Sequence, residues 1–280
     1  FLEEYGSLHL GKSTVLCKDT PAFIANRIGV YSILSLFRLV EEMGMGVDDA
    51  DTLTGAVLGR PKSATFRTCD IVGLDTLVKV AKGLHQALTA DESRDHFSLP
   101  GSIEKMVERN MLGDKTGQGF YKKSKDAQGK KEILSLDLAT LNYRPKVKTR
   151  FATLDQAKTF DSLDQRLPVL LQGKDKAGEF YRRTFFGLFR YVSFRIPEIT
   201  DELYRIDEAL RTGFGWEKGI FECWDILGVN ATVKHMKEAG MMPAPWIDEM
   251  LAAGVQTFYK QEARPLLSYD PATKQYKPPP

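Results

Sequence analysis

The sequence predicts an all-α protein with two tandem copies of one helical-bundle module, joined by an irregular basic connector. Three observations predict this fold class. Long stretches carry apolar residues at helical spacing, the alternation typical of strands is scarce, and a set of landmark residues recurs once in the same order. The composition of 280 residues, 42% hydrophobic and 27% charged, is that of a folded globular chain.

The clearest element is a helix expected from Thr20 and Pro21 to about Gly44. Thr20 is a favourable N-cap, and Pro21 suits the first helical position because its fixed φ is already helical. Apolar residues in this stretch point in nearly every direction around the helix axis. A helix that is apolar all round is expected to be central and buried.

The rest of the first copy also favours helices. Helical patterns cover residues 48–58, 64–87 and 102–111, and a Gly/Pro loop at Gly59-Arg60-Pro61 separates the first two. Strand-like alternation is confined to a short tail at residues 117–122. We therefore expect a first helical domain over residues 1–124.

The connector expected over residues 125–178 begins within a basic segment. Residues 122–150 contain nine Lys or Arg and three acidic residues, a net charge of +6, with little helical periodicity. This pattern is typical of a solvated connector, and it also fits a site for the anionic tail of a ligand. The second copy is expected over residues 179–280.

The repeat is inferred from landmark residues that recur in the same order in both copies. Each copy has a Gly-bearing loop, at residues 55–61 and 213–219. Each loop follows an acidic helix start, Asp48/Asp49 in the first copy and Asp207/Glu208 in the second. The paired landmarks are Phe37-Arg38 with Phe189-Arg190, residues 66–73 with 221–228, Ile103 and Met106 with Ile247 and Met250, and residues 120–122 with 258–260.

Charge and composition exclude several classes of protein. The net charge of +2 argues against a protein that mainly coats nucleic acid or anionic membrane. No uncharged run is longer than that of residues 28–37, which is half of the roughly 20 residues that span a bilayer, so no membrane span is expected. Cys17, Cys69 and Cys223 are far apart and are expected to be buried thiols, with no disulfide or metal role. Because the chain begins at Phe1, we expect a piece of a longer polypeptide.

Few residues suggest chemistry of their own. The four histidines are scattered, no metal-type spacing occurs, and no Gly-x-Gly pair extends to the G-x-G-x-x-G dinucleotide fingerprint. Asn26 and Arg27 stand out because they interrupt the apolar helix, and a buried amide or guanidinium needs partners. Asn26 could orient a substrate oxygen or a catalytic side chain, or it could merely tie the helix to a loop.

A glycine-rich segment over residues 113–122 is the second candidate. A tight turn there could present Lys115 and neighbouring backbone amides to an anion, because closely spaced glycines permit positive φ. The alternative is a turn that only precedes a short terminal strand.

Together these two segments resemble the 3-hydroxyacyl-CoA dehydrogenases. Asp19-Thr-Pro-Ala-Phe-Ile-Ala-Asn-Arg27 is similar to the family signature, with Ala22 in place of the commoner Gly, and Lys115-Thr-Gly-Gln-Gly-Phe-Tyr121 is similar to the end of the family's C-terminal domain. Residues 59–66 and 70–75 resemble the long forms, which carry two such helical domains in tandem. The likeness is strong over residues 10–122 and looser over 180–265.

The resemblance implies an activity and roles for two residues. Family members pair a Rossmann domain with a helical bundle like the C-terminal domain of 6-phosphogluconate dehydrogenase. They oxidise 3-hydroxyacyl-CoA to 3-oxoacyl-CoA with NAD in fatty-acid β-oxidation. A His–Glu pair of the Rossmann domain is the base. An Asn that holds substrate and His maps onto Asn26, the catalytic candidate, and the cofactor-binding lysine maps onto Lys115; no metal is implied.

The Rossmann half has no counterpart in this sequence, so the isolated fragment is expected to be inactive. Eleven residues before Phe37 lies Asn26, whereas eleven before Phe189 lies Gly178, and the second copy has no room for the lysine turn. We therefore predict that the second copy is structural and packs against the first.

The expected partners follow from the resemblance. They are acyl-CoA, the absent N-terminal Rossmann domain with its NAD, an enoyl-CoA hydratase domain in the same chain, and a thiolase. For a bacterial source, a cytoplasmic location is expected. The alternatives are a catalytically silent helical assembly or binding module, and nucleic-acid binding through residues 122–150. The second alternative is disfavoured by the single aromatic residue there, Tyr143.

Overall fold

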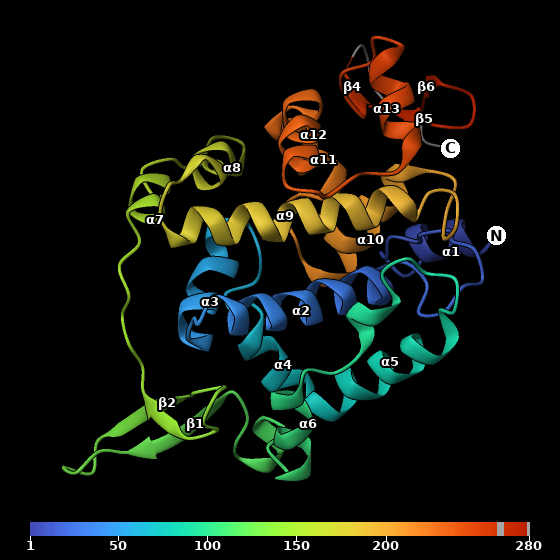
Figure 1. Cartoon of the computed structure of the whole chain (residues 1–280). Helices are drawn as coiled ribbons and strands as arrows, with labels where there is room; N and C mark the ends of the chain where they lie inside the picture. Colours follow the sequence, from blue (N-terminus) through green and yellow to red (C-terminus); the bar gives the residue numbers. More distant parts are fainter. Residues whose placement is uncertain (262–265, 279–280) are drawn as a thin grey trace. The chain divides into compact units, whose positions relative to one another are not determined.

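A computed structural model describes residues 1–261 and 266–278 of the chain, which consist mainly of helices (Figure 1). The α-helices are α1 (Leu2–Leu8), α2 (Ala25–Glu42), α3 (Val47–Thr54), α4 (Phe66–Val72), α5 (Leu74–Ala87), α6 (Gly101–Glu108), α7 (Ala152–Ala157), α8 (Leu163–Gln172), α9 (Lys176–Phe194), α10 (Leu203–Phe214), α11 (Ile220–Leu227), α12 (Val229–Glu238) and α13 (Pro245–Ala252). The short 3-10 helices are η1 (Ala56–Leu58), η2 (Arg94–Phe97) and η3 (Asp114–Thr116).

Strands form two small sheets, each three-stranded and antiparallel. The strands are β1 (Tyr121–Lys125), β2 (Lys131–Leu136), β3 (Tyr143–Pro145), β4 (Tyr259–Lys260), β5 (Leu267–Asp270) and β6 (Gln275–Lys277). The all-α class is therefore confirmed. Within the described residues, no helix is long and apolar enough to cross a bilayer.

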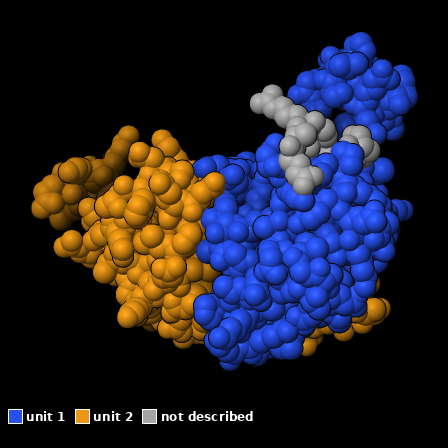
Figure 2. All heavy atoms as spheres, turned by 90° about the horizontal axis from the view of Figure 1, so that it is seen from above, with its two compact units in different colours: residues 1–29, 185–280 blue, residues 30–184 orange. Residues whose placement is uncertain are grey.

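The chain divides into two compact units (Figure 2). Unit 1 contains residues 1–29 and 185–280, and unit 2 contains residues 30–184. The landmarks of the first copy from Phe37 onward fall in unit 2, and those of the second copy fall in unit 1. The division between the units passes through α2 and α9. The start of α2 lies in unit 1 with the landmarks of the second copy, and the start of α9 lies in unit 2 with the landmarks of the first copy. The expected boundaries at residues 124 and 178 remain predictions.

The predicted start of α2 is wrong by about four residues. Residues 21–24 form a turn, and the helix begins at Ala25. Ala22 and Phe23 have φ values of 62° and 54°, in the left-handed region, which interrupts a right-handed helix. The Phe23 amide donates to the Thr20 carbonyl, so Thr20 closes the turn instead of capping the helix.

The connector is more ordered than the irregular segment expected. It contains β2, β3, α7 and α8, and β1 pairs with β2 in a register that places Tyr121 opposite Ser135. Figure 1 shows the β1–β2 hairpin extending away from the helices of unit 2. Cross-strand pairing supplies the backbone hydrogen bonds that helical periodicity could not indicate. All three cysteines are free thiols; Cys69 and Cys223 are buried as predicted, whereas Cys17 is partly exposed.

Three phenylalanine rings in mutual contact form an aromatic cluster in the core of unit 2. The ring centroid of Phe37 lies 4.9 Å from that of Phe66 and 5.2 Å from that of Phe120, and the last two rings are 4.8 Å apart, edge to face. All three side chains are almost completely buried. Aromatic pairs of this geometry add to the hydrophobic contribution of burial, so three landmarks of the repeat form one core cluster.

Asp70, which is buried, and Asp51, which is partly buried, bind the start of β1 to the helices of unit 2. The Asp70 carboxylate accepts the backbone N–H groups of Phe120 and Tyr121, each at 2.8 Å. Asp51 accepts three amides at the start of α4, at 2.7 to 3.0 Å, and the Tyr121 hydroxyl at 2.8 Å. Burial raises the pKa of Asp51 and of Asp70 to about 6.

Unit 1 repeats this arrangement. Asp225 accepts the amides of Phe258 and Tyr259 at 2.8 and 2.9 Å, and Asp207 accepts the Tyr259 hydroxyl at 2.8 Å. Asp207 also accepts two amides at the start of α11, at 2.9 and 3.0 Å. Asp207 therefore corresponds to Asp51, which corrects the match of Asp207 with Asp48 drawn from the sequence.

Replacing Ala22 with Gly should stabilise the protein by about 1 kcal/mol, because a left-handed φ costs an L-residue roughly that amount and glycine almost nothing. Urea unfolding followed by circular dichroism measures this. The control is Ala87→Gly at the helical end of α5, where glycine should be neutral or destabilising by up to about 1 kcal/mol. Destabilisation by both substitutions would contradict the left-handed turn.

Asp207 should make stability depend on pH. Burial raises its pKa to about 7 from 3.8, with Glu222 adding to the shift. The folded protein therefore holds a proton that the unfolded chain has lost, and the free energy of unfolding should fall by about 1 kcal/mol per unit between about pH 4 and 7.

The comparison is between urea unfolding curves of the wild type and Asp207→Asn across this pH range. The variant should lack this part of the slope, and the exposed control Asp19→Asn should keep it. Parallel stability profiles of the wild type and Asp207→Asn would show that Asp207 titrates alike in both states.

Candidate functional site

Asn26 is the second residue of α2, and its side chain is exposed. The next residue, Arg27, has no exposed surface. Successive helical residues point about 100° apart, so the two polar residues of this turn face opposite environments. The sequence suggested that both could need buried partners; the structure shows that only Arg27 does.

Arg27 is held by second-copy residues of unit 1. Its Nε donates to the Tyr191 hydroxyl at 2.8 Å, and its Nη2 donates to Glu198 Oε1 at 2.7 Å. The other oxygen of Glu198 pairs with Arg195 at 2.5 Å, and the Arg195 guanidinium lies 4.6 Å from the Tyr191 ring centroid. Charge-assisted bonds of this kind fix a side chain more firmly than neutral ones. The second copy thus immobilises the helical turn that presents Asn26.

A close approach of helices adds to this constraint. A Cβ atom built on Gly29 would lie 2.2 Å from the Phe214 ring, so α2 and α10 meet closely in unit 1 and a side chain at residue 29 would displace that ring. Hydrogen bonds also join the copies in unit 2, where the Tyr181 hydroxyl donates to the Leu53 carbonyl at 2.8 Å. Each of these contacts joins residues of both copies within one unit, and the packing of the second copy as a whole against the first remains a prediction.

Lys115 lies in η3 of unit 2, and its ammonium pairs with Asp75 at the start of α5. Both side chains are nearly half exposed. This hydrogen bond lowers the pKa of the Asp75 carboxyl. Lys115 belongs to unit 2, whereas Asn26 belongs to unit 1. Each residue is therefore described within its own unit.

The glycine-rich turn beside Lys115 binds an anion that belongs to the protein itself. A Cβ on Gly119 would lie 2.0 Å from Asp70 Oδ1, and Gly113 and Gly117 have positive φ. The amides of Phe120 and Tyr121 donate to Asp70, and those of Thr116, Gly117 and Gly119 donate to backbone carbonyls. These five amides are therefore not available to an external anion, which corrects that part of the expectation.

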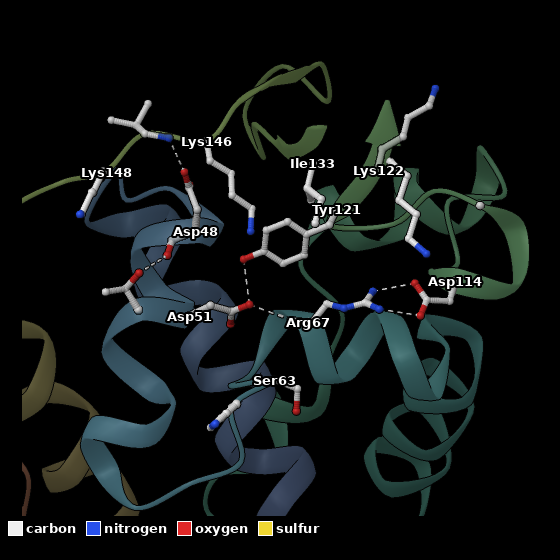
Figure 3. Close-up of a pocket in the computed structure, with 15 residues that line it drawn as sticks. Asp48, Asp51, Ser63, Arg67, Asp114, Tyr121, Lys122, Ile133, Lys146 and Lys148 are labelled. Carbon is white, nitrogen blue, oxygen red and sulfur yellow. Dashed lines mark hydrogen bonds and ion pairs between the residues drawn. The ribbon is translucent and has the colours of Figure 1, made fainter. Parts of the chain in front are cut away.

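A pocket of about 660 Å³ adjoins this turn in unit 2; we call it the lysine pocket. Side chains from α3, α4, η3, β1 and residues 146–148 line it. In Figure 3 the Tyr121 ring stands in its centre with its hydroxyl toward Asp51, and Arg67 lies beside Asp114. Sequence reasoning did not identify this pocket, although the net charge of residues 122–150 was its signal.

The residues present do not form a dinucleotide site. Both sheets of the described chain are antiparallel, so there is no strand edge of Rossmann type, and Lys115 supplies a single exposed ammonium that Asp75 already binds. Among the described residues, no group of His, Cys, Asp or Glu could hold a metal ion.

Comparison with known protein families finds a match to most of the first copy. Residues 23–123 match the family described as "3-hydroxyacyl-CoA dehydrogenase, C-terminal domain". These residues belong to that family. The matched region contains both Asn26 and Lys115 of the family-like motifs.

Two relatives extend the similarity to nearly the whole chain. A "Probable 3-hydroxyacyl-CoA dehydrogenase" of Bacillus subtilis is 38% identical over 96% of this chain and 34% of its own length. A "Putative fatty acid oxidation complex trifunctional enzyme" of Rickettsia prowazekii is 27% identical over 90% of this chain and 34% of its own length. The chain thus spans about one third of the length of each of these two relatives.

The fold recurs in a crystal structure of 3-hydroxybutyryl-CoA dehydrogenase from Escherichia coli K12. The TM-score is 0.56 at 18% identity, over 87% of this chain and 63% of that one. At this identity the likeness concerns the fold alone, and it covers both helical copies.

Removing the Glu198 carboxylate should weaken unit 1. Glu198→Ala removes the ion pair that Glu198 forms with the buried Arg27, so we expect a loss of about 2 kcal/mol in the free energy of unfolding. The control is Asp201→Ala, since Asp201 pairs with Lys18 where both side chains are exposed and the loss should stay below about 1 kcal/mol. Equal losses in urea titrations would contradict a special role for Glu198.

Proposed function

We propose that this chain is the substrate-side part of an NAD-dependent 3-hydroxyacyl-CoA dehydrogenase of fatty-acid β-oxidation. The observation that carries the proposal is the exposed amide of Asn26 on a helical turn immobilised through Arg27, Tyr191 and Glu198. An exposed side chain on a fixed turn is what positioning of a substrate requires, because misplacement of a contact costs rate. Membership of residues 23–123 in the family supports the same assignment.

In this proposal the first copy presents Asn26 to the substrate, and the second copy holds the turn in place through Arg27. The Asn26 amide donates a hydrogen bond to the substrate oxygen that changes from hydroxyl to carbonyl, and its own carbonyl accepts a hydrogen bond from a catalytic His on another domain. Arg27 acts as a positioning residue. NAD and the catalytic base belong to a Rossmann domain of the full-length enzyme, and Lys115 lies near that cofactor. The isolated chain is inactive for this reason.

The partners proposed are acyl-CoA and the enzymes of neighbouring steps. The Rickettsia relative is named as a trifunctional enzyme of a fatty acid oxidation complex, which supports an enoyl-CoA hydratase domain in the same polypeptide and a thiolase beside it. A cytoplasmic location is part of the same proposal.

A second candidate is a catalytically silent helical assembly module. The ion pair of Lys115 with Asp75, and the use of the glycine turn to bind Asp70, favour it because both give motif residues a structural purpose. The exposure of Asn26 favours the enzyme, since an exposed amide contributes little to packing.

Asn26→Ala separates these candidates. In the full-length dehydrogenase we expect turnover to fall by a factor on the order of 10 to 1000, the usual loss for one orienting contact, with unfolding unchanged. The assay is NADH formation from a 3-hydroxyacyl-CoA. The matched control is Asn230→Ala, which removes an exposed amide of α12 and should leave turnover unchanged. Unchanged turnover in Asn26→Ala would remove Asn26 from the mechanism.

A further inference from the structure

The lysine pocket contains more positive charge than its own acids can neutralise. Five lysines and Arg67 line it, together with three aspartates. Its volume of about 660 Å³ lies within the range of small-molecule sites, roughly 300 to 1,000 Å³. The lysines are Lys62, Lys122, Lys123, Lys146 and Lys148.

The aspartates of the pocket are committed to partners within the protein. Asp48 binds the Arg144 guanidinium at 3.0 Å and the Val147 amide at 2.8 Å. Asp114 forms a two-pronged pair with Arg67, at 2.6 and 2.7 Å. Asp51 is occupied by its three amides and the Tyr121 hydroxyl. No carboxylate of the pocket is therefore left to neutralise the lysines.

The lysines, by contrast, form no close ion pairs with carboxylates, although the charge of Lys123 contributes to lowering the pKa of Asp114. Among residues 1–261 and 266–278, none of the five has a carboxylate oxygen within 4.0 Å. Lys146 lies 4.5 Å from the centroid of the Tyr121 ring, and Lys122 lies 5.3 Å from that of Tyr143. Aromatic faces attract cations without cancelling their charge, so the ammonium groups stay available to an anion.

The second copy supplies an internal comparison. A pocket of about 710 Å³ in unit 1 is lined by Tyr259, the counterpart of Tyr121, and by Glu222, which stands where the first copy has Arg67. Four glutamates and two arginines line this acidic pocket. The same place in the repeat thus has opposite charge in the two copies, so the fold does not require the lysines.

We infer that the lysine pocket binds a phosphate-bearing ligand of nucleotide size. Phosphate groups fit clustered ammonium groups, and the partly exposed Ile133 and Val147 offer apolar contact to the organic part of such a ligand. The phosphates can come from the CoA portion of an acyl-CoA or from a free nucleoside polyphosphate. The inference does not rest on the dehydrogenase assignment, because binding by this chain tests it without turnover.

Isothermal titration calorimetry of the chain with CoA, dephospho-CoA, ATP and adenosine tests the inference. We expect CoA or ATP to bind, adenosine not to bind, and affinity to fall as salt rises, because exposed charges are screened. The combined variant Lys122→Gln, Lys146→Gln, Lys148→Gln should raise Kd on the order of 10-fold. The control Lys79→Gln, Lys82→Gln, Lys105→Gln removes three exposed charges from α5 and α6 and should leave Kd nearly unchanged.

The outcomes divide clearly. CoA binding tighter than dephospho-CoA and ATP assigns the phosphates to CoA, and equal or tighter ATP binding assigns them to a free nucleotide; both support the pocket. Absence of binding, or equal weakening in both combined variants, overturns it. A single-stranded oligonucleotide that binds far more tightly than ATP also overturns it, in favour of a nucleic-acid surface. Circular dichroism verifies folding, and the single variant Lys148→Gln at an exposed position replaces the combined one if needed.

Discussion

An aspartate carboxylate that accepts two consecutive backbone amides is the interaction on which both copies depend. Asp70 holds the amides of Phe120 and Tyr121, and Asp225 holds those of Phe258 and Tyr259. Two amides aimed at one carboxylate offset part of the cost of removing its charge from water. Each pair of hydrogen bonds brings a phenylalanine into the aromatic core and a tyrosine hydroxyl to a second aspartate.

This constraint explains the glycine-rich turn of the first copy. The carboxylate of Asp70 lies so close to Gly119 that a side chain there would displace it. The motif therefore combines a structural requirement at its glycines with an exposed lysine at Lys115. The glycines are required by the close approach of Asp70, whereas the lysine is exposed and has no such packing requirement. A motif match alone does not distinguish these two causes.

The first turns of two helices are grouped with residues of the other copy: the start of α2 falls in unit 1, and the start of α9 falls in unit 2. The first turn of α2 belongs to unit 1, where Tyr191 and Glu198 hold Arg27. The second copy has no counterpart of Asn26, yet it fixes the turn that presents this residue. The second copy therefore contributes to the position of Asn26 through its scaffold, because Tyr191 and Glu198 hold the neighbouring Arg27.

The sequence by itself determined the helical class, the two copies and the two motif segments, because apolar periodicity and repeated landmarks are local in the chain. Some features depended on contacts between distant residues. The left-handed turn at Ala22 and Phe23 moved the start of α2, and strand pairing ordered the basic connector. Only the tertiary structure decided that Arg27 is buried and Asn26 exposed, and that lysines from separate segments line one pocket, since burial and charge clustering depend on what the folded chain brings together.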